Sequence, residues 1–470
     1  MSRKKELFKN TLILLFGKFC TQFLSFFLLP LYTSLLTTSE YGTVDLINTY
    51  VALFIPIINL ELVGALFRFL VDERTNKENQ KKVFTNITSG ISILTVIFVG
   101  LILIINIFIK IDYLWYIILN IVTMIMSAIS LQVARGVGKN IDYTIGSVIC
   151  AVGIIGFNIL FLTVFHMRVD GMLLSSGIGN LLCFIYIFFK LKLYKMFDLK
   201  VFNKSNLKEA VKYSAPLVPS SISWWIINVS DRTMVTYFLG IAANGIYSLS
   251  NKFSGIFISV YNVFNLSWTE SATIHINDSD KDSFFTSTIN TMFKLFSSVA
   301  LLIIVTMPFI FNILVNKQYN DSYNYIPLLL IGSIFNVLIG LLSPIYIALK
   351  KTKEIAKTAI IAAIINIAIN LFLIKLIGIY GACFSTIIAF MVMSIYRYYD
   401  IQKYVKVKIE REAIITLMAA FTLSMYFYYL NNIIGNIFSL MLITLYVIYI
   451  NKNLLKTGYK GLLNMTLKRN

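Results

Sequence analysis

Long apolar stretches separated by short polar segments run along almost the whole chain. Fourteen of these stretches hold at least the roughly 18 residues that a helix needs to cross the hydrocarbon core of a bilayer. Backbone groups in lipid must be satisfied within their own segment, so each stretch is expected to be helical. The pattern therefore predicts an all-α polytopic membrane protein of about 14 transmembrane helices. The predicted spans are residues 10–32, 42–70, 83–109, 113–134, 143–166, 171–190, 211–239, 243–270, 284–314, 323–349, 355–377, 380–399, 412–430 and 433–450.

The composition agrees with a membrane protein. The chain is 58% hydrophobic and 13% charged, with a mean hydropathy of +0.78, whereas soluble domains are nearer one-quarter charged. A net charge of +19 would also suit a nucleic-acid-binding protein. The basic residues lie in short segments between the apolar stretches, however, so no nucleic-acid partner is expected. The four cysteines have no CxxC spacing and the two histidines stand alone, so no disulfide framework and no metal site are expected.

The distribution of lysine and arginine gives an orientation. Of the 41 basic residues, 32 lie in one alternating set of loops and in the termini, and four lie in the opposite set. The positive-inside rule then predicts that both termini are cytoplasmic. The outward loops are all short, which leaves no room for an outer catalytic domain. We therefore expect a transporter and not an enzyme.

The chain resembles itself at an offset of 203–212 residues. Residues 36–48 align with 239–251, residues 171–175 align with 381–385, and the loops at 138–140 and 350–352 fall in register between them. Six helices separate the matched segments, so the repeats start on the same side of the membrane and are parallel. The predicted divisions are an N-lobe of six helices (1–199), a pseudo-symmetric C-lobe of six helices (200–408), and two further C-terminal helices with a cytoplasmic tail (409–470).

Charged and polar side chains inside the spans mark the candidate site. A charge at the centre of a membrane helix costs about 2.5–3.5 kcal/mol, so each should face a cavity or a partner. Helical spacing gathers several of them into polar stripes, one of which runs from Asp45 to Asn59. The candidate substrate-binding residues are Lys18, Arg68, Arg232, Lys252, Asp45, Asn48, Asn251 and Trp224, and the candidates for coupling to an ion are Asp45, Glu61 and Asp231.

Several of these residues also have structural explanations. Arg68 lies near the predicted cytoplasmic end of its span, where its side chain can extend to the interface. Asp231 and Lys252 lie at similar depth on neighbouring antiparallel spans and can simply pair with each other. Trp224 suits packing at the membrane interface as well as stacking on a sugar ring. Lys294 is expected to have a structural role.

Three stretches of sequence carry a family resemblance. They are residues 9–43, with Leu28-Leu-Pro-Leu-Tyr and Glu40-Tyr-Gly-Thr, the segment Ala65-Leu-Phe-Arg-Phe69, and residues 231–253, which begin Asp231-Arg-Thr-Met and end Ser-Asn-Lys-Phe253. In these stretches the chain resembles the Wzx-type flippases, the polysaccharide-export branch of the multidrug/oligosaccharidyl-lipid/polysaccharide (MOP) exporter superfamily. Glu61-Leu-Val-Gly64 departs from the pattern, because a glycine-centred segment is expected there.

The resemblance implies a two-lobe transporter of the bacterial cytoplasmic (inner) membrane that works by alternating access. It would move an undecaprenyl-pyrophosphate-linked oligosaccharide, such as an O-antigen repeat of lipopolysaccharide or a capsule repeat, from the inner to the outer leaflet. The alternatives are a cation-coupled drug exporter of the same fold and a flippase for the peptidoglycan precursor. A polysaccharide polymerase and the chain-length machinery are candidate partners, besides the lipid-linked oligosaccharide and the bilayer.

The chemistry of such a substrate agrees with the candidate residues. A pyrophosphate needs cations, which Lys18, Arg68, Arg232 and Lys252 would supply. No GxxxxGK[ST] loop is present, so ATP is not expected and no cofactor is expected. An inside-negative membrane potential drives negative charge outward, and moving one such charge across it releases about 2.3 kcal/mol per 100 mV. Coupling to protons or to sodium, through Asp45, Glu61 or Asp231, is an alternative source of energy.

Overall fold

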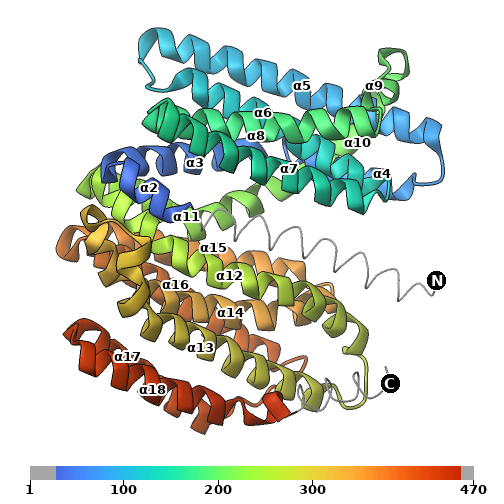
Figure 1. The fold of residues 1–470 in the computed structure, drawn as a ribbon. Coiled ribbons are helices and arrows are strands. Elements are labelled where there is room, and N and C mark those ends of the chain that lie inside the picture. Colours follow the sequence, from blue (N-terminus) through green and yellow to red (C-terminus); the bar gives the residue numbers. More distant parts are fainter. Residues whose placement is uncertain (1–27, 457–470) are drawn as a thin grey trace, which may run out of the picture. The chain divides into compact units, whose positions relative to one another are not determined.

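The computed structural model describes residues 28–456 of the chain, which form helices joined by short loops and contain no strand. Their contacts divide the chain into two compact units (Figure 1). Unit 1 comprises the residues up to Thr236 together with Gly240–Gly245, and unit 2 comprises Tyr237–Leu239 and the residues from Ile246 onward. The predicted all-α polytopic fold is confirmed.

The helices of unit 1 are α2 (Leu29–Leu35), α3 (Thr38–Ile58), α4 (Leu62–Asp72), α5 (Lys77–Phe108), α6 (Leu114–Gly136), α7 (Asn140–Ile159, extended by a π-helical turn, Leu160–Val164), α8 (Arg168–Lys190), α9 (Leu193–Met196), the short 3-10 turns Leu199–Val201 and Ala215–Leu217, α10 (Lys204–Ser214) and most of α11 (Val218–Leu239). The contacts thus group α10 and most of α11 with unit 1, although the predicted C-lobe begins at residue 200. The lobe boundaries themselves stay a prediction.

The remaining helices are α12 (Ile241–His275), which begins in unit 1 and continues in unit 2, α13 (Lys281–Leu314), the 3-10 segment Lys317–Tyr325, α14 (Ile326–Ala348), α15 (Thr352–Ile377), α16 (Ile379–Ile401), α17 (Arg411–Leu430) and α18 (Ile433–Ile450). Within unit 2, α14 packs against α16 and α15, and α13 packs against both α17 and α18. The last two helices lie side by side, in red in Figure 1.

Eleven of the described helices are long and apolar enough to cross a membrane. The predicted first span, 10–32, lies almost wholly outside the described residues. The predicted spans 211–239 and 243–270 correspond to α11 and α12, which are not among the eleven. Both helices carry charged and polar side chains within the span, which lowers their mean hydropathy. The total of 14 spans therefore stays a prediction.

A buried face of α4 shows how the core of unit 1 is built. Leu62, Leu66 and Leu70 recur every four residues and are wholly buried against α5 and α6. Lipid is as apolar as leucine, so burying these side chains brings no hydrophobic gain in a membrane. Close packing against the neighbouring helices stabilises α4 instead. Just beyond α4, the Arg74 guanidinium donates to the backbone oxygens of Gly136 (2.8 Å) and Arg135 (3.0 Å) at the end of α6. The negative end of the α6 dipole also stabilises a cation at this position.

Two repeat-equivalent glycines meet within unit 1. A Cβ atom built on Gly245, in the first turn of α12, would lie 1.9 Å from the carbonyl oxygen of Thr38. A Cβ atom on Gly42 would lie 2.2 Å from the carbonyl oxygen of Ile241 and 2.8 Å from the Gly245 nitrogen. Only glycine permits this approach of two backbones. The Asn244 amide adds a hydrogen bond to the Gly42 oxygen (3.0 Å).

After the sixth helix of each predicted repeat, the chain returns along the third helix of that repeat. We name these returning segments strap 1 (residues 197–203) and strap 2 (residues 402–410). In strap 1, Lys81 of α5 forms an ion pair with Asp198 (2.7 Å), and the Asn86 Oδ1 accepts from the backbone N–H of Asn203 (2.5 Å). The hydrogen bond from Lys81 holds the pKa of Asp198 below its ordinary value.

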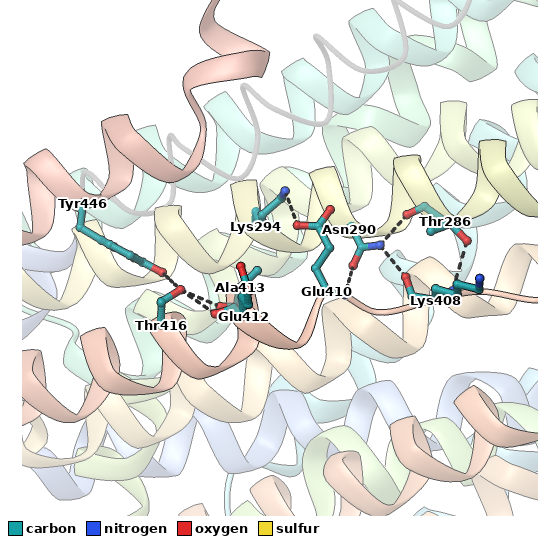
Figure 2. Close-up of polar contacts among 9 residues, drawn as sticks. All are labelled: Thr286, Asn290, Lys294, Lys408, Glu410, Glu412, Ala413, Thr416 and Tyr446. Atoms are coloured by element: carbon teal, nitrogen blue, oxygen red, sulfur yellow. Dashed lines mark hydrogen bonds and ion pairs between the residues drawn. The ribbon is translucent and has the colours of Figure 1, made fainter.

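Strap 2 is held by α13 in the same way (Figure 2). The Asn290 amide donates to the backbone oxygen of Lys408 (2.8 Å), and its Oδ1 accepts from the backbone N–H of Glu410 (3.1 Å). Lys294 forms an ion pair with Glu410 (2.9 Å). Asn290 lies 204 positions after Asn86, which falls within the offset of the sequence repeat. The predicted repeat therefore extends to the way each unit fastens its returning segment.

We expect the Asn290→Ala variant to loosen strap 2. It removes two hydrogen bonds to the strap, each worth about 1 kcal/mol, so the free energy of unfolding should fall by about 2 kcal/mol. Limited trypsin digestion of the purified protein should cut faster after Lys406 and Lys408. The control is Asn312→Ala, an exposed residue farther along α13. Equal cleavage rates in both variants would contradict the assignment.

Candidate functional site

A polar seam joins α3 and α4 to α11 inside unit 1. The seam consists of Asp45, Thr49 and Glu61 on one side and Ser221, Trp225 and Arg232 on the other. As residue numbers rise along α3, the partner numbers fall along α11, so the two helices run antiparallel. Lipid offers no hydrogen-bond partners, so these polar groups satisfy one another between the helices.

The centre of this seam is an ion pair between α3, one of the eleven apolar helices, and α11, a further predicted span. The Arg232 Nη1 lies 3.2 Å from the Asp45 Oδ1 and 3.5 Å from the Thr49 hydroxyl. The side chains of Arg232 and Asp45 are 25% and 11% exposed to solvent. Both contacts of Arg232 involve Nη1, so among residues 28–456 its Nε and Nη2 have no hydrogen-bond partner or ion pair. The other carboxylate oxygen of Asp45 is buried and accepts no hydrogen bond from the described residues.

The two ends of the seam are fixed by neutral donors. The Trp225 Nε1 donates to the backbone oxygen of Thr49 (2.9 Å), and the Ser221 hydroxyl donates to the Glu61 Oε1 (2.5 Å). Helical spacing along the predicted span 211–239 places Ser221, Trp224, Asn228 and Asp231 in one polar stripe. The face that contacts α3 instead carries Ser221, Trp225 and Arg232, because spacings of four and seven residues place them on one side of a helix.

A break separates α3 from α4 and corrects the continuous helix predicted over 42–70. Leu60 and Glu61 have φ of 49° and 58°, a left-handed conformation that is unusual for residues other than glycine. Each such residue costs of order 1–3 kcal/mol and persists only where its surroundings hold it. Pro56, which lacks a backbone N–H, precedes the break within α3.

The other candidates in unit 1 differ in their surroundings. Arg68 lies on α4, pairs with Asp72 one turn later and is half exposed, which agrees with the alternative that its side chain reaches the interface. Asn48 is exposed on α3, and Trp224 keeps 38% of its exposure on α11. Asp231 is almost wholly buried, with 3% of its exposure. Of the predicted unit 1 set, the structure brings together Asp45 and Arg232.

The remaining candidates lie elsewhere. Lys252 is exposed on α12 of unit 2. Asn251, its neighbour, is half-buried, and its amide donates to the backbone oxygen of Tyr247 (3.1 Å), one turn earlier. Lys18 lies outside the described residues.

An apolar cavity of about 520 Å³ lies in unit 2 between α13, α14, α16 and α17. Its walls include Phe335 of α14, Tyr399 of α16 and Phe421 of α17, and Ile409 of strap 2 lines it as well. A second apolar cavity, of about 410 Å³, lies between α3, α5 and α6 of unit 1. Cavities of this lining suit hydrocarbon chains better than polar ligands.

Sequence reasoning missed a buried arginine. Arg397 lies near the end of the predicted span 380–399 and was not selected as a candidate, but it is within α16 and wholly buried. Its guanidinium donates to the Thr358 hydroxyl (2.9 Å), the Ser343 hydroxyl (2.5 Å) and the Ile355 backbone oxygen (3.2 Å). These contacts tie α14, α15 and α16 together, so Arg397 serves the packing of unit 2.

A buried amide cluster in unit 2 was also missed. Ser385 donates to the Asn370 Oδ1 (2.7 Å), and the Asn370 amide donates to the Asn366 Oδ1 (3.1 Å). All three side chains are wholly buried. The signal available in the sequence was two asparagines four residues apart within an apolar span, which places them on one helix face.

The family is decided by the sequence from the N-terminal region to the middle of α12. A family model described as "Polysaccharide biosynthesis protein" matches residues 7–268, more than half of the chain. The chain belongs to the polysaccharide biosynthesis protein family. The match includes every residue of the seam. None of the curated proteins is significantly similar to the chain.

Solved structures share the fold of this member of the polysaccharide biosynthesis protein family. The lipid II flippase MurJ, in its inward closed conformation, is similar with a TM-score of 0.70 and 16% identity, over 97% of this chain and 100% of that chain. An inward-facing multidrug resistance MATE family transporter of the MOP superfamily is similar with a TM-score of 0.66 and 13% identity, over 85% and 95%. A MOP superfamily transporter from Pyrococcus furiosus is similar with a TM-score of 0.60 and 12% identity, over 87% and 96%. The MOP-type fold predicted from the sequence is confirmed.

Proposed function

We propose that this protein is a flippase that moves a lipid-linked oligosaccharide, joined through pyrophosphate to a polyprenyl chain, across the bacterial cytoplasmic membrane. The observation that carries the proposal is the guanidinium of Arg232 in the polar seam. Its Nη1 contacts Asp45 and Thr49, while Nε and Nη2 lack described partners. An arginine in a predicted span, with donors that no described residue engages, suits an anionic group such as pyrophosphate.

Three further observations support this substrate class. The family model concerns polysaccharide biosynthesis. The matched MurJ structure is of a lipid II flippase. The apolar cavity of unit 2 offers a place for part of a hydrocarbon tail while the polar head crosses. A glycan head cannot cross hydrocarbon unaided, because its hydroxyl groups would lose their hydrogen bonds to water.

In the proposed mechanism, basic side chains hold the pyrophosphate and the protein exposes it to one side of the membrane at a time. Lys18, Arg68, Arg232 and Lys252 are the proposed cations, and Trp224 is the proposed stacking partner for a sugar. Both termini would be cytoplasmic, as the loop charges predict. The membrane potential favours outward movement of the anionic head, so no nucleotide is required. A polymerase that acts on the exported repeat unit is the proposed partner.

The test uses purified protein in liposomes that contain a fluorescent undecaprenyl-pyrophosphate oligosaccharide. A membrane-impermeant quencher reports which leaflet holds the head group. We expect transfer by the wild type and its loss in Lys18→Ala and Lys252→Ala, with insertion unchanged. The control is Lys317→Ala, an exposed lysine in a predicted outward loop.

Parallel liposomes separate the alternatives. One set contains lipid II and another is loaded with a cationic drug. Transport of the drug alone would refute the flippase proposal, and transport of lipid II alone would assign the protein to the peptidoglycan precursor. Full transfer of the oligosaccharide by both lysine variants would remove these lysines from the site.

A further inference from the structure

The break between α3 and α4 gathers oxygen atoms that have lost their usual partners. In a continuous helix, the backbone N–H groups of Glu61 and Leu62 would bond to the carbonyl oxygens of Ile57 and Ile58. Here they bond to the oxygens of Pro56 (3.3 Å) and Asn59 (2.8 Å) instead. The carbonyl oxygens of Ile57 and Ile58 are therefore released from the helix at its C-terminal end.

Asn59 supplies an independent observation. Asn59 is only 2% exposed, and its Oδ1 accepts no hydrogen bond from the described residues. A buried amide oxygen without a partner is costly, so native structures usually satisfy it with a protein donor, a water molecule or an ion. Asn59 directly precedes the two left-handed residues, so the oxygen without a partner belongs to a residue of the break.

Glu61 and Ser221 add a charge and a hydroxyl. The half-buried Glu61 carboxylate follows Asn59 by two residues and accepts from the Ser221 hydroxyl of α11 (2.5 Å). Arg68, the arginine of α4, forms its ion pair with Asp72, so this cation does not neutralise Glu61. The hydroxyl of Ser221 keeps its lone pairs while it donates, so it can also act as a ligand.

The combined set consists of oxygen atoms only, with a single carboxylate. Oxygen ligands suit hard cations, and the C-terminal end of α3 presents the negative end of its dipole to the same place. Divalent ions usually take more carboxylates, and the described chain holds no group of three His, Cys, Asp or Glu side chains that could bind a metal. Irregular backbone at membrane depth is tolerated where it lines a protein-enclosed or watery site, and broken helices of transporters bind sodium through such freed carbonyls.

We propose that the α3–α4 break is a sodium site, with ligands from Glu61, Asn59, Ser221 and the freed carbonyls. The site adds a coupling ion to the proposed flippase and does not depend on which lipid the protein carries. It also explains why a glutamate occupies a position where the resembling flippases are expected to have a glycine-centred segment. The charge of Glu61 binds the ion, and the ion in turn stabilises the strained turn.

The experiment measures thermal unfolding of the full-length protein in detergent, without any glycan, in NaCl, KCl or choline chloride at equal ionic strength. We expect sodium to raise the unfolding midpoint of the wild type in a concentration-dependent way, because a ligand that binds only the folded state stabilises it. Glu61→Gln should abolish the shift. Ser221→Ala, which keeps the charge and removes one ligand, should raise the sodium concentration for half the shift by about tenfold.

The matched control is Glu73→Gln, which removes a carboxylate just beyond the other end of α4 and should keep the full sodium response. An unchanged response in Glu61→Gln, or equal midpoints of the wild type in all three salts, would overturn the proposal. The proposal would also be overturned, in favour of a proton site, if the unfolding midpoint responded to pH and not to sodium and Glu61→Gln removed that response. A sodium response without oligosaccharide transfer in liposomes would reject the proposed flippase and leave the ion site standing.

Discussion

Arg232→Ala is expected to abolish oligosaccharide transfer and to destabilise the protein. Removing the guanidinium leaves the Asp45 carboxylate, 11% exposed, without its cation. Breaking a buried ion pair costs about 3–5 kcal/mol, and the partial exposure of Arg232 places the expected loss near 3 kcal/mol. The loss should appear as a lower unfolding midpoint in detergent, and the transport defect should appear in the liposome assay.

A double variant separates the two effects. Asp45→Asn with Arg232→Gln replaces the ion pair by neutral polar groups, so no charge is left unpaired in the seam. We expect this variant to recover most of the unfolding midpoint and none of the transfer. Recovery of transfer together with stability would show that Arg232 only holds α11 against α3.

Gly245→Ala is expected to have the second large effect, on stability. The added Cβ would lie 1.9 Å from the Thr38 oxygen, a backbone atom that cannot rotate away. The first turns of α3 and α12 would have to separate, and the hydrogen bond from Asn244 to Gly42 would be lost with them. We expect the free energy of unfolding to fall by about 3 kcal/mol or more, at the upper end of overpacking effects.

Gly255→Ala on the same helix is the matched control. A Cβ atom on Gly255 would meet no heavy atom within 4 Å. Alanine favours helix over glycine by about 1 kcal/mol, so this variant should unfold at the same temperature as the wild type or at a higher one. Similar destabilisation of both variants would show that the close approach at Gly245 has no special importance.

The sequence predicts the membrane helices well, because a span needs a minimum apolar length and that length can be counted along the sequence. The break at Leu60 and Glu61 is different. Pro56 gave a weak signal, but neither residue that adopts the left-handed conformation is a glycine or an asparagine, the types that normally reveal such a turn. The contacts that hold the break come from α11, far away in the sequence.

The candidate site was predictable to the extent that buried charge is rare. Asp45 and Arg232 were both selected because a charge inside a span requires a reason, and the structure pairs them. Their pairing, and the register that turns Trp225 rather than Trp224 toward α3, depend on how two distant helices pack. Arg397 was missed because its position near a span end looks like a loop, and only three-dimensional packing shows that it is buried.

The contact between Gly42 and Gly245 has a reciprocal form. The position of each glycine's absent side chain falls on the backbone of the segment that carries the other glycine. Self-complementary contacts of this kind arise where identical chains pair about a twofold axis. Here the two matching positions lie in one chain, and each is encoded separately. Each position must stay glycine to leave room for the backbone that carries the other, so a change at either one is enough to disrupt the contact.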